Sequence, residues 1–198
     1  MKTALKAGCI LFLNLFLVFA GSGYAEEEKK QAGPLVGIEY LTGFAQAKLR
    51  EKGSYSAVPM MVDFDFNLKP LTKKIGFNPP GLLQFQLEPF INPVYRPDSN
   101  VEIGNSFLIK IGFLPDNFKF QPYFKGGAGL IYITQHTREQ STQFNFVEYA
   151  GCGIHYFFNK NTAFTVEGRY RHLSNASIKQ PNKGIDTYFF LAGLSYLF

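Results

Sequence analysis

The sequence predicts an all-β fold, an eight-stranded antiparallel barrel that spans a membrane. Three observations support this. Apolar and polar side chains alternate with a period of two through most of the chain, as they do in β-strands. Aromatic residues make up 17% of the chain, and charged residues only 18%. Beyond the N-terminal segment, the sequence has no apolar run of about 20 residues, which a membrane-spanning helix needs.

The N-terminal segment has the features of a secretory signal. Two lysines precede the apolar residues 10–20, and small residues lead to an expected cleavage after Ala25. We therefore expect a cleaved signal peptide over residues 1–25 and one barrel domain over residues 26–198. The alternative, a retained membrane anchor, is disfavoured because the apolar run is short.

Charge and cysteine content exclude several functions. The full chain has a formal net charge of +5, and loss of the two lysines in residues 1–25, which contain no acid, leaves +3. This mild excess gives no support for nucleic acid binding and suits an anionic lipid surface. Cys152 is the only cysteine after residue 25, so no intrachain disulfide is expected. No metal-ligand spacing is present.

Eight strands follow in order, and residues typical of turns, such as Asn, Asp, Pro and Gly, separate most of them. They are expected at 34–49, 54–69, 81–96, 99–114, 118–136, 143–158, 162–174 and 185–198. Alternation is clearest in the second, third and fourth strands. Residues 70–80 are the least regular segment.

The polar faces of these strands carry charges of both signs. Five acids and five bases lie there: Asp63, Asp65, Glu88, Glu102, Glu167, Arg96, Lys110, Lys125, Arg169 and Arg171. In a membrane barrel the apolar face meets lipid and the polar face lines the interior. A barrel of eight strands is just filled by side chains, so we expect these charges to pair as a structural plug. In the alternative, a soluble barrel, the apolar face would pack a core.

The last strand supports a place in the outer membrane. Its aromatic residues alternate and end on Phe198, a pattern that resembles the signal presented to the barrel-assembly machinery. With both ends of an even-stranded barrel in the periplasm, residues 175–185 form an extracellular connection. Residues 114–118 and 158–162 form periplasmic turns.

Three reactive groups converge on the outer face of the last two strands. The apolar phase of strand 162–174 continues through Tyr170 to His172 and Ser174, and Asp186 faces outward on the next strand. A serine hydroxyl needs a base to become a nucleophile, histidine can supply it, and a carboxylate orients the imidazole. The alternative is an ordinary polar rim at the top of the barrel.

The stretch from His172 to Asp186 closely resembles the signature of the PagL family, the lipid A 3-O-deacylases. The resemblance implies an outer-membrane acyl hydrolase that needs no cofactor and no metal. His172 matches the general base and Ser174 the nucleophile of the family. Asp186 stands where the family usually has Glu.

The resemblance also implies roles for neighbouring residues. Asn175 matches a residue implicated in the oxyanion hole, and Ser177 lies near the oxyanion donors where Gly is expected. From their location, and not from the resemblance, Lys179 and Lys183 are candidates for binding substrate phosphates and Tyr170 for an acyl-chain groove. The alternative for the lysines is ordinary solvated loop charge. Further loop cations near the same end are Lys48, Arg50, Lys52 and Arg138.

The substrate implied by this location is lipid A of lipopolysaccharide, reached from the surrounding outer-membrane lipid. Two other functions stay open. One is a non-enzymatic outer-membrane barrel with an adhesive or structural role, and the other is a related phospholipase or acyltransferase. A homodimer is also left open.

Overall fold

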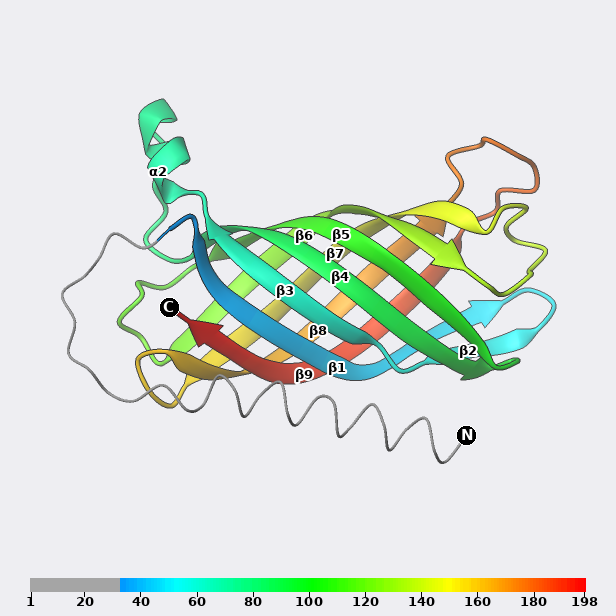
Figure 1. Ribbon diagram of the computed structural model, residues 1–198, viewed down its shortest axis with the longest axis horizontal. Helices are drawn as coiled ribbons and strands as arrows, with labels where there is room; N and C mark the ends of the chain where they lie inside the picture. Colours follow the sequence, from blue (N-terminus) through cyan, green and yellow to red (C-terminus); the bar gives the residue numbers. More distant parts are fainter. Residues whose placement is uncertain (1–32) are drawn as a thin grey trace. The chain divides into compact units, whose positions relative to one another are not determined.

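The computed structural model describes residues 33–198, which form a closed antiparallel barrel (Figure 1). The predicted signal peptide, residues 1–25, lies outside the described residues. The elements are β1 (Leu35–Leu49), β2 (Gly53–Ala57), β3 (Met60–Asn67), helix α2 (Lys69–Thr72), 3-10 helix η1 (Lys73–Ile75), β4 (Leu83–Arg96), β5 (Asn100–Gly112), β6 (Phe120–Ile133), β7 (Phe144–Phe157), β8 (Thr162–Ser174) and β9 (Ile185–Leu197). No helix among the described residues is long and apolar enough to cross a membrane.

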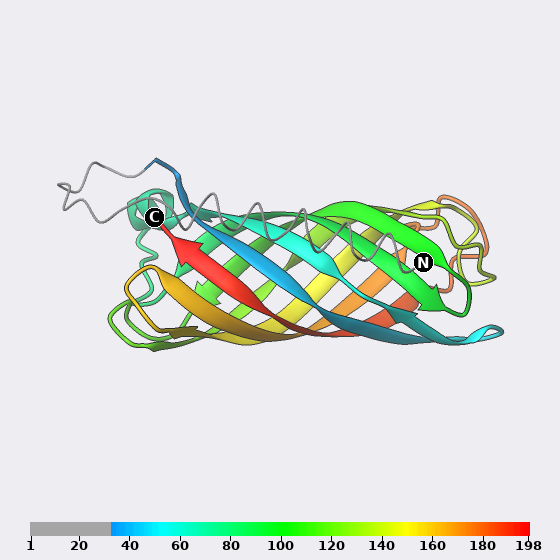
Figure 2. The ribbon, with the colours of Figure 1, turned by 60° about the horizontal axis from the view of Figure 1, so that its bottom comes forward.

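Each strand pairs with its neighbours, and β1 pairs with β9 to close the ring. The strands are tilted strongly against the barrel axis (Figure 2). β2 and β3 both pair with β1 and β4, so together they occupy one position, and the ring has the eight positions that the sequence predicted. The expected strand 54–69 is divided at Pro59, which has no N–H to donate to a neighbouring strand.

The predicted assignment of faces is confirmed. Exposed apolar side chains cover the outside of the barrel, and polar side chains are buried inside it. Aromatic residues gather where strands meet turns at one end of the barrel, the end at which β1 begins and β9 finishes. They include Phe113, Phe118, Phe120, Tyr156, Phe158, Tyr196 and Phe198. Aromatic girdles of this kind suit a membrane interface, and the topology expected from the sequence makes this end the periplasmic one.

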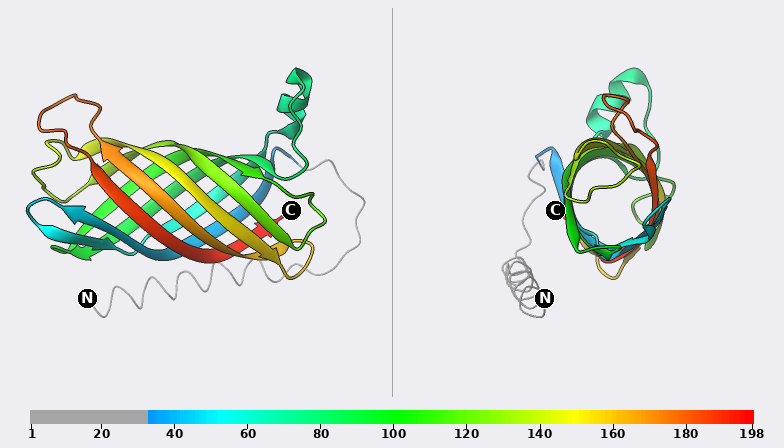
Figure 3. Two further views of the ribbon diagram at one scale, coloured as in Figure 1. Left: turned by 180° about the vertical axis from the view of Figure 1, so that it is seen from behind. Right: turned by 90° about the vertical axis from the view of Figure 1, so that its right-hand side faces the viewer.

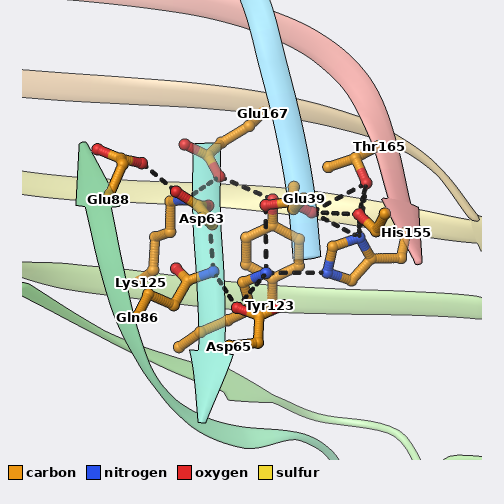
Figure 4. Close-up of polar contacts among 12 residues, drawn as sticks. Glu39, Asp63, Asp65, Gln86, Glu88, Tyr123, Lys125, His155, Thr165 and Glu167 are labelled. Atoms are coloured by element: carbon orange, nitrogen blue, oxygen red, sulfur yellow. Dashed lines mark hydrogen bonds and ion pairs between the residues drawn. The ribbon is translucent and has the colours of Figure 1, made fainter. Parts of the chain in front are cut away.

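The interior is filled by a network of paired charges (Figure 4). Arg169 binds both carboxylate oxygens of Glu88, at 2.6 and 2.8 Å, and Lys125 lies 3.0 Å from both Asp63 and Glu167. These contacts satisfy charges that would be costly to bury alone. The predicted plug is therefore present.

Two details of the plug differ from the prediction. Arg96 was expected inside, but it is exposed, because it is the last residue of β4 and lies at the rim. Glu39 on β1, which the alternation did not single out, is fully buried and lies 3.3 Å from Lys110 Nζ. Toward the extracellular end the interior becomes an apolar core, with members such as Leu41 and Leu173.

We predict that Arg169→Met destabilises the barrel by roughly 3–5 kcal/mol, because Glu88 and Glu167 would lose one of their two buried cationic partners and keep only Lys125. The free energy of unfolding can be measured by urea titration in phospholipid vesicles. Arg138→Met is the matched control, since its pair with Glu51 is exposed and contributes little. Equal effects of both substitutions would show that the interior network does not stabilise the fold.

Candidate active site

His172 and Asp186 are direct partners in the register between β8 and β9, on the outer face near the extracellular end. The imidazole Nδ1 lies 2.7 Å from Asp186 Oδ1, and the two side chains are 38% and 57% exposed. The shorter side chain of Asp, compared with the usual Glu, therefore reaches the imidazole. With Nδ1 engaged by the carboxylate, Nε2 is left to act as a base.

Tyr170 also contacts this carboxylate. Its hydroxyl donates a hydrogen bond of 2.7 Å to Asp186 Oδ1, the oxygen that meets His172. Its ring packs against the ring of Tyr188 in a tilted arrangement, with 5.5 Å between the ring centroids. The sequence suggested Tyr170 only as a groove residue. The structure adds a hydroxyl that helps to hold Asp186 in place.

Ser174 is the last residue of β8 and shares the outer face with His172. Residues two apart on a strand are separated by about 7 Å along the chain, and no hydrogen bond joins the Ser174 hydroxyl to His172 in residues 33–198. Hydrogen bonds between catalytic groups are often long without substrate. A rotation of either side chain would bring the hydroxyl toward Nε2.

Asn175 follows and is fully buried. Its N–H donates to Asn182 Oδ1 at 2.9 Å, and its Nδ2 donates to Lys179 O at 2.7 Å and Ser141 Oγ at 3.2 Å. Both kinds of donor on Asn175 are thus used to hold the loop 175–184 together. An oxyanion hole here would need other donors or a rearranged loop.

The next two residues form a tight turn. Ala176 and Ser177 have φ values of 51° and 63°, and the N–H of Ile178 donates to Asn175 O at 3.0 Å. Positive φ at both central positions is the pattern of a type I′ turn, which favours Gly and Asn. The backbone N–H groups of Ala176 and Ser177 have no acceptor within the described chain.

The loop between β6 and β7 supports this turn, and the two loops lie at the same end of the barrel (Figure 3). Ser141 Oγ donates to Lys179 O at 2.8 Å, and the N–H of Lys183 donates to Glu139 O at 2.9 Å. Gln140 and Asn182 form an isolated bridge. The sequence did not indicate these contacts, since they join loops about 40 positions apart.

Gly184 packs against the imidazole. Its φ is +72°, and a Cβ placed there would lie 2.4 Å from Cε1 of His172. The absence of a side chain therefore lets the returning backbone cover one side of the ring. The sequence placed Gly184 only within the expected connection of residues 175–185.

Glu148 on β7 is the other neighbour of His172 in the sheet register. It is exposed and lies on the outer face, so it adds a second carboxylate beside the imidazole. The phase of strand 143–158 could have shown this residue. Among residues 33–198, no group of three or more His, Cys, Asp or Glu side chains is placed to bind a metal ion.

The predicted loop cations differ in their pairing. Lys52 lies 3.2 Å from Asp98, and Arg138 lies 2.6 Å from Glu51. Lys179 and Lys183, in the loop beside His172, are exposed and have no acid within 4.0 Å in the described chain. These two lysines are therefore available for an anion.

An open apolar groove of about 560 Å³ lies on the outer face of β6 to β9; Tyr170 and Tyr188 line it, but His172 and Asp186 do not. Its floor consists of small outward residues, Ala150, Cys152 and Gly168. Larger side chains border it: Phe124, Tyr170, Tyr188 and Phe190. Since Tyr170 and Tyr188 each lie two residues from the reactive pair on the same strands, the groove leads from this pair toward the middle of the membrane.

The closed ring, the aromatic outer surface and the charged plug define an outer-membrane β-barrel. Solved structures agree: the outer membrane enzyme PagL is 16% identical, with a TM-score of 0.53 over 79% of this chain and 97% of that one. Neisserial surface protein A is 14% identical, with a TM-score of 0.60 over 82% and 97%. At these identities, the likeness shows the fold.

The family model for lipid A 3-O-deacylase (PagL) matches residues 60–195, which is more than half of the chain. The chain therefore belongs to this family of outer-membrane enzymes. A sequence search of curated proteins finds no match.

We predict that Gly184→Ala lowers lipid A deacylation by about 10²-fold, because the new methyl group displaces His172 and small misplacements of reacting groups are costly. The rate is measured on lipopolysaccharide by mass spectrometry. Gly53→Ala is the matched control, because Gly53 has a φ of +73° and nothing within 4 Å of an added Cβ. Similar losses in both variants would indicate backbone strain rather than contact with the imidazole.

Proposed function

We propose that this protein hydrolyses the ester at the 3-position of lipid A with Ser174 as nucleophile, His172 as general base and Asp186 as the orienting acid. The observation that carries the proposal is the 2.7 Å contact between His172 and Asp186 on the outer face, two residues along the strands from the Tyr170 and Tyr188 that line the apolar groove. Polar groups are costly on a lipid-facing surface and are tolerated near the interface, where this pair lies. Catalysis gives a reason for this pair.

The reaction proceeds in two steps. Ser174 Oγ attacks the ester carbonyl carbon while His172 Nε2 takes its proton. The tetrahedral intermediate then releases the sugar 3-hydroxyl, which receives that proton, and leaves the acyl group on Ser174. In the second step His172 removes a proton from water, which attacks the acyl-enzyme. The fatty acid leaves, and Ser174 regains its proton.

The negative charge that develops on the carbonyl oxygen needs hydrogen-bond donors. The N–H groups of Ala176 and Ser177 are suitable, because they follow Ser174 closely and have no acceptor in the described chain. The sequence resemblance assigned this role to Asn175 and Ser177. The internal bonds of Asn175 support a different role for it, the shaping of the turn that presents these N–H groups.

The groove suits the acyl chain of the substrate. Its lining is almost wholly apolar, and it extends down the outside of the barrel from Tyr170 and Tyr188. An acyl chain of lipid A already lies in the outer leaflet, so it can enter from the side. Lys179 and Lys183, above the pair, are placed to bind a phosphate of the sugar headgroup.

The first test is mass spectrometry of lipid A from cells that express the wild-type chain or a variant. We expect the wild type to remove one ester-linked acyl chain, and Ser174→Ala to lower this activity by about 10³-fold or more. Asp186→Asn should lower it by roughly 10²- to 10⁴-fold, because the imidazole loses its orienting charge. Both variants should retain the barrel, as shown by their heat-dependent gel mobility. A folded Ser174→Ala protein with normal activity would refute the proposal.

The second test concerns the groove. Nothing lies within 4 Å of a Cβ added at Gly168, so Gly168→Leu should fold normally and obstruct the floor. We expect kcat/KM to fall about tenfold or more for lipid A, with little change for a soluble short-chain ester. Ala192→Leu, on the outer face of β9 outside the groove, is the control. Equal losses for both esters would show that the groove does not hold the acyl chain.

A further inference from the structure

The connection between β3 and β4 is long for a periplasmic turn. Residues 68–80, here called the periplasmic arm, contain α2 and η1 and leave the barrel at the end where β9 finishes (Figure 1). In the end view the arm stands outside the outline of the ring of strands (Figure 3). It therefore extends sideways from the barrel, over the position of the neighbouring lipids, and does not cover the barrel mouth.

The arm exposes apolar side chains. Neither α2 nor η1 buries a residue, and Leu71, Ile75 and Phe77 are 62%, 81% and 47% exposed. Single exposed apolar residues are common on proteins. Three in one short segment beside a membrane rim indicate a surface that meets another apolar phase.

The charge of the arm has one sign. It carries Lys69, Lys73 and Lys74, and residues 68–80 contain no acid. Lys69 Nζ lies 3.6 Å from Asp116 in the turn between β5 and β6, which ties the base of the arm to the barrel. Lys73 and Lys74 are exposed and have no acid within 4.0 Å in the described chain.

The base of the arm lies level with the aromatic belt. Asp116, its partner, is in the same turn as Phe118, which is 50% exposed, and Phe120 follows at the start of β6 with 58% exposed. Exposed aromatic residues at the ends of barrel strands mark the membrane interface. The arm thus begins at the depth of the lipid headgroups.

We infer that the periplasmic arm is an interfacial anchor that binds anionic phospholipids of the periplasmic leaflet. Leu71, Ile75 and Phe77 enter the upper acyl region, and Lys73 and Lys74 contact the phosphates, as in other basic amphipathic segments on membranes. The arm lies at the opposite end of the barrel from the candidate active site. Membrane binding by the arm therefore does not depend on the proposed catalytic mechanism.

The chain contains no tryptophan, so Ile75→Trp introduces a single tryptophan, which is excited at a wavelength that the 11 tyrosines do not absorb. The variant is refolded into vesicles of phosphatidylcholine alone or with phosphatidylglycerol, with lipids brominated high on the acyl chain as quenchers. With phosphatidylglycerol we expect blue-shifted emission and at least about twofold stronger quenching than in phosphatidylcholine. Adding Lys73→Glu and Lys74→Glu should remove this difference.

Two reporters serve as controls. Phe120→Trp lies on the barrel wall and should be quenched in both lipids. Ile178→Trp lies in the extracellular loop, where Ile178 is 69% exposed, and should be quenched in neither lipid. Emission from Ile75→Trp that matches Ile178→Trp would overturn the inference and favour a protein partner. Quenching that is equal in both lipids and unaffected by the lysine changes would overturn the anionic preference.

Discussion

The pairing of β1 with β9 is the constraint on which the rest of the structure depends. In lipid, every backbone N–H and C=O must find a partner within the protein, and a closed ring of strands is one of the few solutions. In a closed ring, each side chain of a strand points either to the lipid or to the interior. The alternation of the sequence therefore becomes a division between an apolar outer surface and a filled polar interior.

The same division creates two polar groups of residues with different functions. Inside, Arg169, Lys125 and their acids neutralise one another and close the barrel as a plug. Outside, His172 and Asp186 lie on the lipid-facing surface, where a polar pair is tolerated because it is near the rim and its members contact each other. This placement gives the pair direct access to an ester of a membrane lipid.

The candidate active site combines rigid and irregular parts. His172, Asp186 and Tyr170 lie on paired strands, which hold them in a defined geometry. The N–H groups proposed as oxyanion donors lie in a turn with two positive φ values, a conformation that costs free energy for residues other than Gly. Contacts from the β6–β7 loop, such as the hydrogen bond from Ser141 to Lys179 O, hold the loop that contains this turn.

The sequence by itself predicted the eight strand positions and their faces, because these follow from local periodicity and residue type. The same periodicity predicted that His172, Ser174 and Asp186 face outward, whereas their catalytic roles came from the resemblance of the stretch from His172 to Asp186 to a known family. Only the tertiary structure showed that Arg96 lies at the rim, that the Tyr170 hydroxyl holds Asp186, and that Gly184 must lack a side chain beside His172. The position of the periplasmic arm outside the ring of strands was also visible only in the tertiary structure. These features depend on distances between segments that are remote in sequence or on where a strand ends in space, and a periodic pattern carries neither kind of information.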